Sequence, residues 1–418
     1  MEQRRKNLTQ LFIPICLETL LYMLSGMVDT LMLSSVNDQA VGAVGTANTY
    51  IGIFIIMFSV ISSGMVAVMT QNIGAGRPGV AYQARQLGLA FNAVLGVIMS
   101  LFLSLGAGTI LSGVGVADAL MQPAKTYLQI VGGFCILNAL IPICSSYLRA
   151  FGFSKEPLYA SIIGNVINFC LNAFFLFVLH KGVAGVATAT VISRIINLVI
   201  VVLLGAVLVK AKQHPERESN RAVMGQIIRI GLPSACETAI YNVSMTLVIR
   251  FLNQMDAQGL NVTARSYTMQ ITNFSYCVGA ALAQANAIMT GWHIGAKEYD
   301  ACDRGTKKAA VIGVIVAVIL ETVFTLCSGW IMQLFSKDPQ MVSLVGKLLA
   351  IDIVLEIGRV TNLVYGQALK TSGDAVFPVV MGACFMILCS VGGTYLFGIR
   401  LGLLAVGAYI GMTGDECV

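Results

Sequence analysis

Long apolar runs separated by short polar segments follow one another along the whole chain, and they restrict its fold more than any other feature. Val311–Leu320 and Leu198–Val209 contain no charged residue. Each lies inside a longer apolar stretch of about 20 residues or more, which is enough for a helix to cross the roughly 30 Å of hydrocarbon in a bilayer. The sequence therefore predicts a polytopic helical membrane protein, with the lipid bilayer as a partner.

The scarcity of charge supports the same interpretation. Charged residues make up 11% of the 418 residues, against about 25% in a typical soluble domain. The net charge of +6 does not indicate a nucleic-acid partner, because the basic residues fall in short loops, where membrane topology favours them. The 11 cysteines are scattered without a CxxC pair, so we interpret them as small apolar residues of helices rather than as metal ligands or disulfides.

Hydropathy and helix-breaking residues predict twelve membrane-spanning helices. They lie near residues 9–34, 40–72, 84–113, 120–149, 157–180, 184–210, 226–252, 263–292, 305–334, 340–369, 375–398 and 402–418. The most polar segment separates the sixth span from the seventh, so we predict an N-terminal six-helix lobe over 1–211, a cytoplasmic linker over 212–225 and a C-terminal six-helix lobe over 226–418. The twelfth span is short and ends next to two carboxylates, so we expect that this last helix is truncated and that the full-length form continues.

Landmarks in the first half of the chain return about 220 residues later, in the same order. With six spans in each copy, this repeat indicates a duplicated six-helix unit. Because six is even, both copies enter the membrane in the same direction, which predicts a parallel repeat of two pseudo-symmetric bundles with a cleft between them. The recurring pairs are Pro14 with Pro233, Glu18 with Glu237, Ile73–Ala75 with Ile294–Ala296, Leu148–Pro157 with Leu369–Pro378, and Gly182–Ala187 with Gly402–Gly407.

Lys and Arg residues concentrate in alternate loops, which predicts the orientation of the chain. Cytoplasmic loops of membrane proteins carry an excess of these residues. We therefore expect a multi-pass protein of the cell membrane, with the N-terminus and the 212–225 linker in the cytoplasm. The basic residues of the predicted cytoplasmic side are Arg4, Arg5, Lys6, Arg77, Arg85, Arg149, Lys155, Lys210, Lys212, Arg217, Arg221, Arg229, Lys297, Arg304, Lys307, Lys308 and Lys370, against Lys181, Lys337 and Arg400 on the opposite side.

Two carboxylates in the first span are candidates for function. An ionisable group at mid-bilayer costs about 2.5–3.5 kcal/mol on insertion scales, so such a group usually faces a cavity or a partner. Glu18 and Asp29 are eleven residues apart, which puts them on one face of a helix and about 16 Å apart along its axis. Asp29 could bind a cation or a proton inside the bundle, or it could hydrogen-bond to a neighbouring helix. Glu18 returns as Glu237 in the second half, which favours an architectural role.

Polar residues in the fifth and sixth spans offer further cation ligands. Asn168 and Asn172 are one turn apart, as are Thr190 and Arg194. Amide and hydroxyl oxygens can coordinate Na⁺, but the same groups also join membrane helices through hydrogen bonds of roughly 0.6–2 kcal/mol. From the spacing alone, helix association is the favoured interpretation of these groups.

The tenth span carries Asp352, Glu356 and Arg359 on one helical face. Glu356 and Arg359 can neutralise each other, or a carboxylate beside them can carry protons, and both interpretations stay open. Glu321, in the ninth span, is a further buried candidate to which the sequence assigns no partner. The three histidines fall at loops or helix ends, and there is no Walker loop and no GxGxxG motif, so neither a catalytic or zinc cluster nor direct use of ATP is indicated.

Several motifs together resemble those of the multidrug and toxic compound extrusion (MATE) transporters, over nearly the whole chain. The resemblance implies two six-helix lobes, a V-shaped cleft, and export of mostly cationic organic compounds driven by H⁺ or Na⁺. The motifs are VDT at Val28–Thr30, QNIGAG at Gln71–Gly76, LRAFGFSKEP at Leu148–Pro157, GNVINFCLN at Gly164–Asn172, GVAGVATAT at Gly182–Thr190, IGAKEYDA at Ile294–Ala301, LFSKDP at Leu334–Pro339, LEIGRVTN at Leu355–Asn362 and SGDAVFP at Ser372–Pro378.

The same resemblance implies a cation site in the N-terminal lobe. The family uses an Asp in the first helix, an Asn and an Asp one turn apart in the fifth, and a Thr in the sixth. The matching positions here are Asp29, Asn168, Asn172 and Thr190. Asn172 departs from the pattern, and a site with one carboxylate fewer could still hold Na⁺ but weakens a two-carboxylate proton relay.

Some members of the family also use carboxylates in the seventh and tenth helices. Glu237 and Glu356 lie in those helices here, but neither matches position by position, and Arg359 lies close to where the family has an Asp. We therefore treat Glu18, Glu237, Asp352, Glu356 and Arg359 as secondary candidates for coupling or for the cleft.

These observations predict a secondary active antiporter that exports cationic or amphipathic organic compounds in exchange for Na⁺ or H⁺, with cation binding at Asp29 alternating access to the cleft. A monomer is expected, with no cofactor beyond the coupling ion. A flippase for lipid-linked precursors is an alternative within the same superfamily, but it would favour a more cationic interior than this mainly acidic one. A membrane-embedded enzyme is a second alternative, for which the sequence offers no nucleophile–base or metal constellation.

Overall fold

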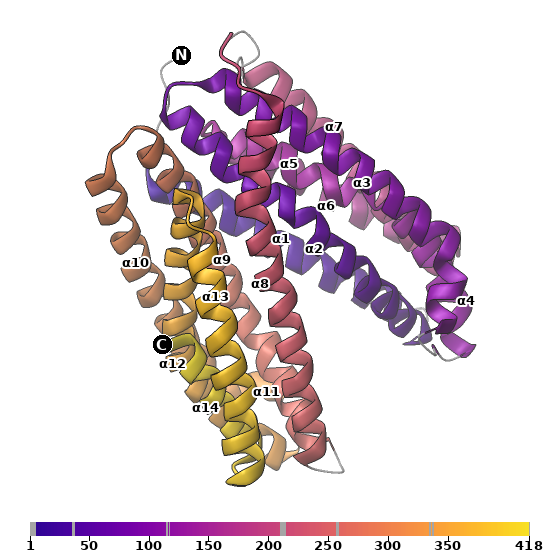
Figure 1. Cartoon of the computed structure of the whole chain (residues 1–418). Coiled ribbons are helices and arrows are strands. Elements are labelled where there is room, and N and C mark those ends of the chain that lie inside the picture. Colours follow the sequence, from indigo (N-terminus) through magenta and orange to yellow (C-terminus); the bar gives the residue numbers. More distant parts are fainter. Residues whose placement is uncertain are drawn as a thin grey trace. The chain divides into compact units, whose positions relative to one another are not determined.

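The structure is a computed structural model that describes residues 6–35, 38–113, 116, 118–209, 215–255, 259–333, 336 and 338–417. Within those ranges the chain consists of α-helices and π-helical segments joined by short connections, and no strand occurs (Figure 1). The all-α membrane fold expected from the apolar runs is confirmed. Some basic residues used to predict the orientation, Arg4, Arg5, Lys210, Lys212 and Lys337, lie outside the described residues.

The first half of the chain forms one compact unit, Met1–Leu232. Within it, α6 packs against both α1 and α7, so these three helices share one interface. The helical elements are α1 (Leu8–Ser34), α2 (Asp38–Gly74), α3 (Pro78–Gly113), α4 (Asp118–Tyr127), η1 (Leu128–Gly132), α5 (Ile136–Ala150), α6 (Lys155–Ala173), η2 (Phe174–Val178), α7 (Gly182–Leu208) and the first part of α8 (Asn220–Met255).

The second compact unit is Pro233–Val418. Its central helix is α12, which packs against α9, α10 and α14. The predicted linker, 212–225, lies partly outside the described residues, and α8 begins within it. The elements that follow α8 are α9 (Leu260–Gly295), α10 (Tyr299–Leu326), α11 (Ser328–Met332), α12 (Pro339–Ser372), α13 (Val376–Phe385), η4 (Met386–Val391), η5 (Thr394–Arg400) and α14 (Leu404–Cys417).

Each of the twelve predicted spans coincides with one helix or with a series of consecutive helical segments. The fourth span is the series α4, η1 and α5, which bends by 43°. The fifth ends in the π-helical segment η2, and the eleventh continues from α13 through η4 and η5. In the described part of the chain, seven helices are long and apolar enough to cross a membrane, or eight when the bent pair counts as one span.

The internal repeat extends to the backbone conformation of the loops. A positive φ favours glycine, because a Cβ crowds the backbone there. Most of the repeated positions carry glycine, and Lys297 adopts this conformation in the second half where the first half has Gly76. The equivalent pairs are Gly76 and Lys297 (φ 74° and 62°), Gly152 and Gly373 (86° and 111°), and Gly182 and Gly402 (53° and 70°).

Pro14 lies inside α1, as Pro233 lies inside α8. Proline has no N–H, so the backbone carbonyl four residues earlier loses its helical partner. For Pro14 this carbonyl belongs to Gln10, and the Ser154 hydroxyl, immediately before α6, donates to it at 2.9 Å. The break in the α1 ladder is therefore compensated by a hydrogen bond from a distant part of the same unit.

Glycines bring α14 against its neighbours in the second unit. A Cβ added at Gly358 on α12 would lie 2.4 Å from the Glu416 backbone oxygen, and one at Gly407 on α14 would lie 2.5 Å from the Gly398 backbone nitrogen. Contacts this close exist only where no side chain intervenes. They place the end of α14, with Glu416, beside the polar face of α12.

Candidate functional site

In the first unit, Asp29 on α1 is connected to α6 and α7 by a chain of hydrogen bonds. The Asn172 amide donates to Asp29 Oδ1 at 2.6 Å and to Asn168 Oδ1 at 3.2 Å. The Asn168 amide donates in turn to Ser193 Oγ at 3.4 Å. The Ser193 hydroxyl donates to the Thr190 backbone carbonyl at 2.9 Å. The structure thus brings a carboxylate of α1 to polar groups of α6 and α7, which lie more than 100 residues later in the sequence.

Most of this network is shielded from the surface. Asn172 is 0% exposed and Asn168 is 5% exposed, whereas Asp29 is partly buried. Asn172 Oδ1 is buried and has no hydrogen-bond partner among the described residues. An unsatisfied buried acceptor costs about 1–3 kcal/mol. A proton donor or a cation that reached this oxygen would remove that cost.

Thr190 lies on α7, one turn before Ser193. Among the described residues, its hydroxyl forms no hydrogen bond with Asp29. Its hydroxyl donates to the Val186 carbonyl of its own helix at 2.9 Å, which leaves the lone pairs of the oxygen for another partner. Ser193, rather than Thr190, accepts the hydrogen bond from Asn168. The sequence interpretation did not include Ser193, although its spacing of three residues from Thr190 puts both on one face of a helix.

Arg194 on α7 carries a positive charge that interacts electrostatically with Asp29 and with Tyr127. An ionised carboxylate inside a membrane bundle needs such a balancing charge. The one-turn spacing of Thr190 and Arg194 therefore brings a hydroxyl and a counter-charge to the same end of the network.

Among the described residues, Glu18 is not part of the hydrogen-bond network around Asp29. It forms an ion pair with Arg149, at 2.5 Å between Oε2 and Nη2, and its other oxygen accepts from the Ser161 hydroxyl at 3.4 Å. In the second unit, Glu237 forms an ion pair with Lys370. Both pairs occupy equivalent positions of the repeat, and each joins the first helix of its six-helix unit to the end of the fourth span.

The second unit contains a buried group of three carboxylates, Glu321 on α10 with Asp352 and Glu356 on α12, which we call the three-carboxylate cluster. One carboxylate oxygen from each lies within 4.8 Å of the other two. The exposed fractions of these residues are 0%, 2% and 0% in the same order. The helical spacing predicts a shared face for Asp352 and Glu356, and Glu321, to which the sequence analysis assigns no partner, lies beside them.

Arg359 lies at one side of this cluster and is shared between two helices. It forms an ion pair with Glu356 and a second, at 3.5 Å from Nε to Oε1, with Glu416 on α14. The Asn362 amide also donates to Glu416, at 2.8 Å to the backbone oxygen and 3.0 Å to Oε2. The ion pair between Glu356 and Arg359, one of the two interpretations that their spacing left open, is present. The sequence analysis did not name Glu416 as a candidate. Its position among acidic residues in an apolar span was the signal that could have found it.

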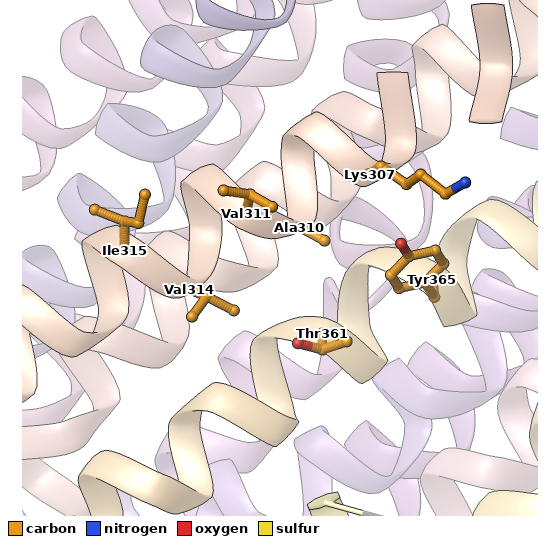
Figure 2. A pocket seen from close by; sticks show the side chains of 7 residues that line it. All are labelled: Lys307, Ala310, Val311, Val314, Ile315, Thr361 and Tyr365. Atoms are coloured by element: carbon orange, nitrogen blue, oxygen red, sulfur yellow. The ribbon is translucent and has the colours of Figure 1, made fainter. Parts of the chain in front are cut away.

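A different feature of the second unit is an open hollow between α10 and α12, of about 500 Å³ (Figure 2). Its lining is mostly apolar, and the ammonium of Lys307 is already engaged with Asp303 at 2.7 Å. None of the candidate carboxylates lines this hollow. We therefore do not place the transport chemistry there. The lining residues are Lys307, Ala310, Val311, Val314, Ile315, Thr361 and Tyr365.

Two repeated helical units with buried carboxylates inside apolar helices define a class of protein, the polytopic membrane transporters, because such carboxylates mark ion and substrate pathways. The MatE family model matches residues 14–174 and 233–396 of the chain, so the protein belongs to the MATE family of transporters and is not an enzyme. The two matches begin at Pro14 and Pro233, one in each copy of the repeat. The family inferred from the sequence motifs is confirmed.

Relatives and solved structures agree with this assignment. The chain is 33% identical over 411 residues to the uncharacterized transporter YisQ of Bacillus subtilis, covering 97% of this chain and 90% of the relative. It is 23% identical over 427 residues to the probable multidrug resistance protein NorM of Thermotoga maritima, covering 98% and 89%.

The fold is shared with solved MATE transporters. An outward-facing MATE transporter of the MOP superfamily has a TM-score of 0.87 at 17% identity, over 98% of this chain and 92% of that one. A MATE structure in a bent conformation has a TM-score of 0.89 at 18% identity, over 98% and 91%.

Proposed function

We propose that this MATE transporter is a secondary active antiporter, which exports cationic or amphipathic organic compounds in exchange for Na⁺ or H⁺. The observation that carries the proposal is the buried hydrogen-bond network around Asp29. Relatives named as probable multidrug resistance proteins support small organic molecules as substrates. We further propose that the protein acts as a monomer in the cell membrane, with its N-terminus and the 212–225 linker in the cytoplasm, since the basic residues concentrate in those loops.

The chemistry of the network suits a small, hard cation or a proton. Carboxylate, amide and hydroxyl oxygens are the ligands that hard cations prefer, and Asp29, Asn168, Asn172 and Thr190 offer all three kinds. The site holds a single carboxylate, so it would bind one monovalent ion or one proton. We propose that these four residues form the coupling site, with Ser193 holding the Asn168 amide in place.

A rearrangement of the Asn172 amide would couple ion binding to helix packing. When Asp29 is ionised, the Asn172 N–H donates to it. When Asp29 holds a proton or Na⁺, the favourable partner becomes the carbonyl oxygen of the same amide, because this oxygen can accept from a carboxylic acid or coordinate the ion. The bond between α1 and α6 therefore differs between the two states. A cation that prefers one arrangement shifts the population of conformations by its difference in affinity.

Transport in proteoliposomes tests this proposal. We expect the Asp29→Asn variant to lose the dependence of efflux on an imposed Na⁺ or pH gradient, measured with a panel of fluorescent cationic dyes. Asp303→Asn is the matched control, because Asp303 is exposed and forms a surface ion pair on α10. Comparison of the two gradients identifies the coupling ion. Efflux that stays coupled in the Asp29→Asn variant would overturn the assignment of the site.

A further inference from the structure

The open hollow between α10 and α12 of the second unit is not used by the mechanism proposed for Asp29. We propose that this hollow binds one phospholipid with an anionic headgroup, from the membrane leaflet at the N-terminal end of α10. One acyl chain of the lipid would lie in the hollow, and its phosphate would lie beside Lys307. The volume of the hollow, about 500 Å³, is within the range of sites that bind small molecules.

The polar and apolar side chains of the hollow lie at opposite ends. Lys307 and Tyr365 lie at one end, where their side chains interact electrostatically, and Val314 and Ile315 lie at the other end (Figure 2). A phospholipid has the same order, with a charged headgroup followed by an apolar chain. A polar solute would lose hydration against the apolar end without gaining a hydrogen-bond partner there. A lipid therefore fits both ends of the hollow.

The apolar part of the hollow is long enough for an acyl chain. Val311 and Ile315 are 59% and 53% exposed, so the described part of the chain leaves them largely uncovered. Lys307 and Ile315 are eight residues apart, which is about 12 Å along the helix, against roughly 15 Å of hydrocarbon in one leaflet. The exposed row continues one turn further to Ile319, which is 57% exposed. An acyl chain that enters beside Lys307 therefore contacts apolar side chains through most of the leaflet.

The charge at the polar end favours an anionic headgroup. Residues 303–308 contain three basic residues and one acidic residue, a net charge of +2. Lys307 pairs with Asp303, but both side chains are more than half exposed, and an ammonium has three donors, so a phosphate can share it. Arg304 and Lys308 are also exposed, and neither forms an ion pair with another described residue. Basic groups between membrane helices bind anionic headgroups in this way.

The polar end of the hollow is not part of the internal repeat. At the equivalent positions, 221 residues earlier, the first unit has Gln86 in place of Lys307 and Cys144 in place of Tyr365. The ion pairs of Glu18 and Glu237 recur in both units because they hold equivalent helices together. The architecture that the two units share therefore does not require Lys307 and Tyr365, as expected for residues of a binding site.

The position of this end in the membrane agrees with the same ligand. The N-terminal end of α10 lies on the predicted cytoplasmic side, and the cytoplasmic leaflet carries the anionic lipids that give it a negative surface potential. This step depends on the orientation proposed above, whereas the hollow and its charges do not.

Native mass spectrometry of the purified protein in detergent tests the site, because it counts the lipids bound to each molecule. The probes are a phosphatidylglycerol and a phosphatidylcholine with the same long acyl chains. We expect one phosphatidylglycerol to bind at least about tenfold more tightly than phosphatidylcholine. The double variant Lys307→Gln, Lys308→Gln should lose most of this preference.

Lys347→Gln is the matched control for the loss of a basic residue. Lys347 is exposed and lies on α12, 18 residues before Tyr365 and therefore about 27 Å from it along the helix. This variant should keep the preference for phosphatidylglycerol.

A second variant tests the apolar part of the site. Val311→Trp fills the hollow at an exposed position without a change of charge, so it should weaken the binding of both long-chain lipids. A phosphatidylglycerol with short acyl chains should also bind weakly, because it keeps the headgroup but has little chain to bury. Gel filtration and circular dichroism check that each variant is folded.

Each part of the proposal has an outcome that overturns it. Equal binding of the two long-chain lipids overturns the anionic headgroup. An unchanged preference in the folded Lys307→Gln, Lys308→Gln protein, or unchanged binding to folded Val311→Trp, overturns the position of the site. Equally tight binding of the short-chain lipid shows that the phosphate alone is recognised, which overturns the acyl-chain groove. None of these measurements involves transport, so their failure is distinct from a failure of the antiport proposed for Asp29.

Discussion

The ion pair between Glu18 and Arg149 offers the sharpest test of how the repeated elements hold each unit together. Glu18 lies four residues after Pro14 in α1, and Arg149 lies at the end of α5. The Ser154 hydroxyl satisfies the carbonyl released by Pro14, so two contacts bind this part of α1 to the region between α5 and α6. The perturbation is Glu18→Gln, which removes the negative charge while preserving the shape.

The magnitude follows from the burial of the pair. The side chains of Glu18 and Arg149 are 15% and 10% exposed. Removing one partner of a buried pair costs about 3–5 kcal/mol, because the other charge is left uncompensated. We expect about 2–4 kcal/mol here, since a little solvent reaches both groups. At about 2–4 °C per kcal/mol for a unit of this size, the apparent unfolding temperature should fall by on the order of 10 °C.

A double-mutant cycle separates the ion pair from the other contacts of these residues. Arg149→Met keeps the apolar stem and should also destabilise, because it leaves the Glu18 carboxylate without its cation. The double variant should be more stable than the sum of the two single effects by about 1 kcal/mol or more, since neither charge then remains.

Thermal unfolding in detergent, followed by circular dichroism at the helix band, is the assay for this cycle. Asp303→Asn is the control, because it breaks an exposed pair with Lys307, and exposed pairs often contribute nothing measurable. If Glu18→Gln unfolds at the same temperature as this control, or if the two single effects simply add, the pair does not stabilise the unit and our account of the repeated glutamates is wrong.

Two further predictions concern the Asp29 site and the packing of α14. Asn172→Asp replaces a hydrogen-bond donor to Asp29 by a second carboxylate. At constant ionic strength, we therefore expect the unfolding temperature of this variant to rise more steeply with Na⁺ concentration than that of the wild type. The same dependence on Na⁺ in both proteins would contradict a cation site at Asp29. Gly358→Ala should destabilise by about 1–3 kcal/mol, because its Cβ would lie 2.4 Å from the Glu416 backbone oxygen. Gly366→Ala, on the same helix with nothing within 4 Å, should be neutral or stabilise by up to about 1 kcal/mol in the same melting experiment.

The fold was predictable because its main signal is local. A membrane span must be apolar over a length set by the bilayer, so hydropathy locates each span without knowledge of its neighbours. The duplication was readable for a similar reason, since Pro14 and Pro233 mark the same position in each copy, and the family model begins its two matches there. The bends and π-helical segments inside the spans were not predicted, because they depend on how neighbouring helices pack.

The candidate site was only partly predictable. Asn168 and Asn172 were expected to share a face because helical spacing determines it, and Asn172 does bind Asp29. Ser193 was missed, since a single hydroxyl in an apolar helix resembles the many that only bond to their own backbone. The role of Asn168 and Asn172 as cation ligands stays a prediction.

The sequence by itself determined that the chain crosses the membrane as helices, that it consists of two copies of one unit, and that it is a MATE transporter. Only the tertiary structure decided which charges of different helices meet. Glu18 and Arg149 are 131 residues apart, and Glu321 reaches Asp352 and Glu356 from a separate helix. The physical reason is that hydropathy reports the cost of leaving water, which each residue incurs on its own, whereas the partner of a buried charge is set by the rotation and packing of whole helices.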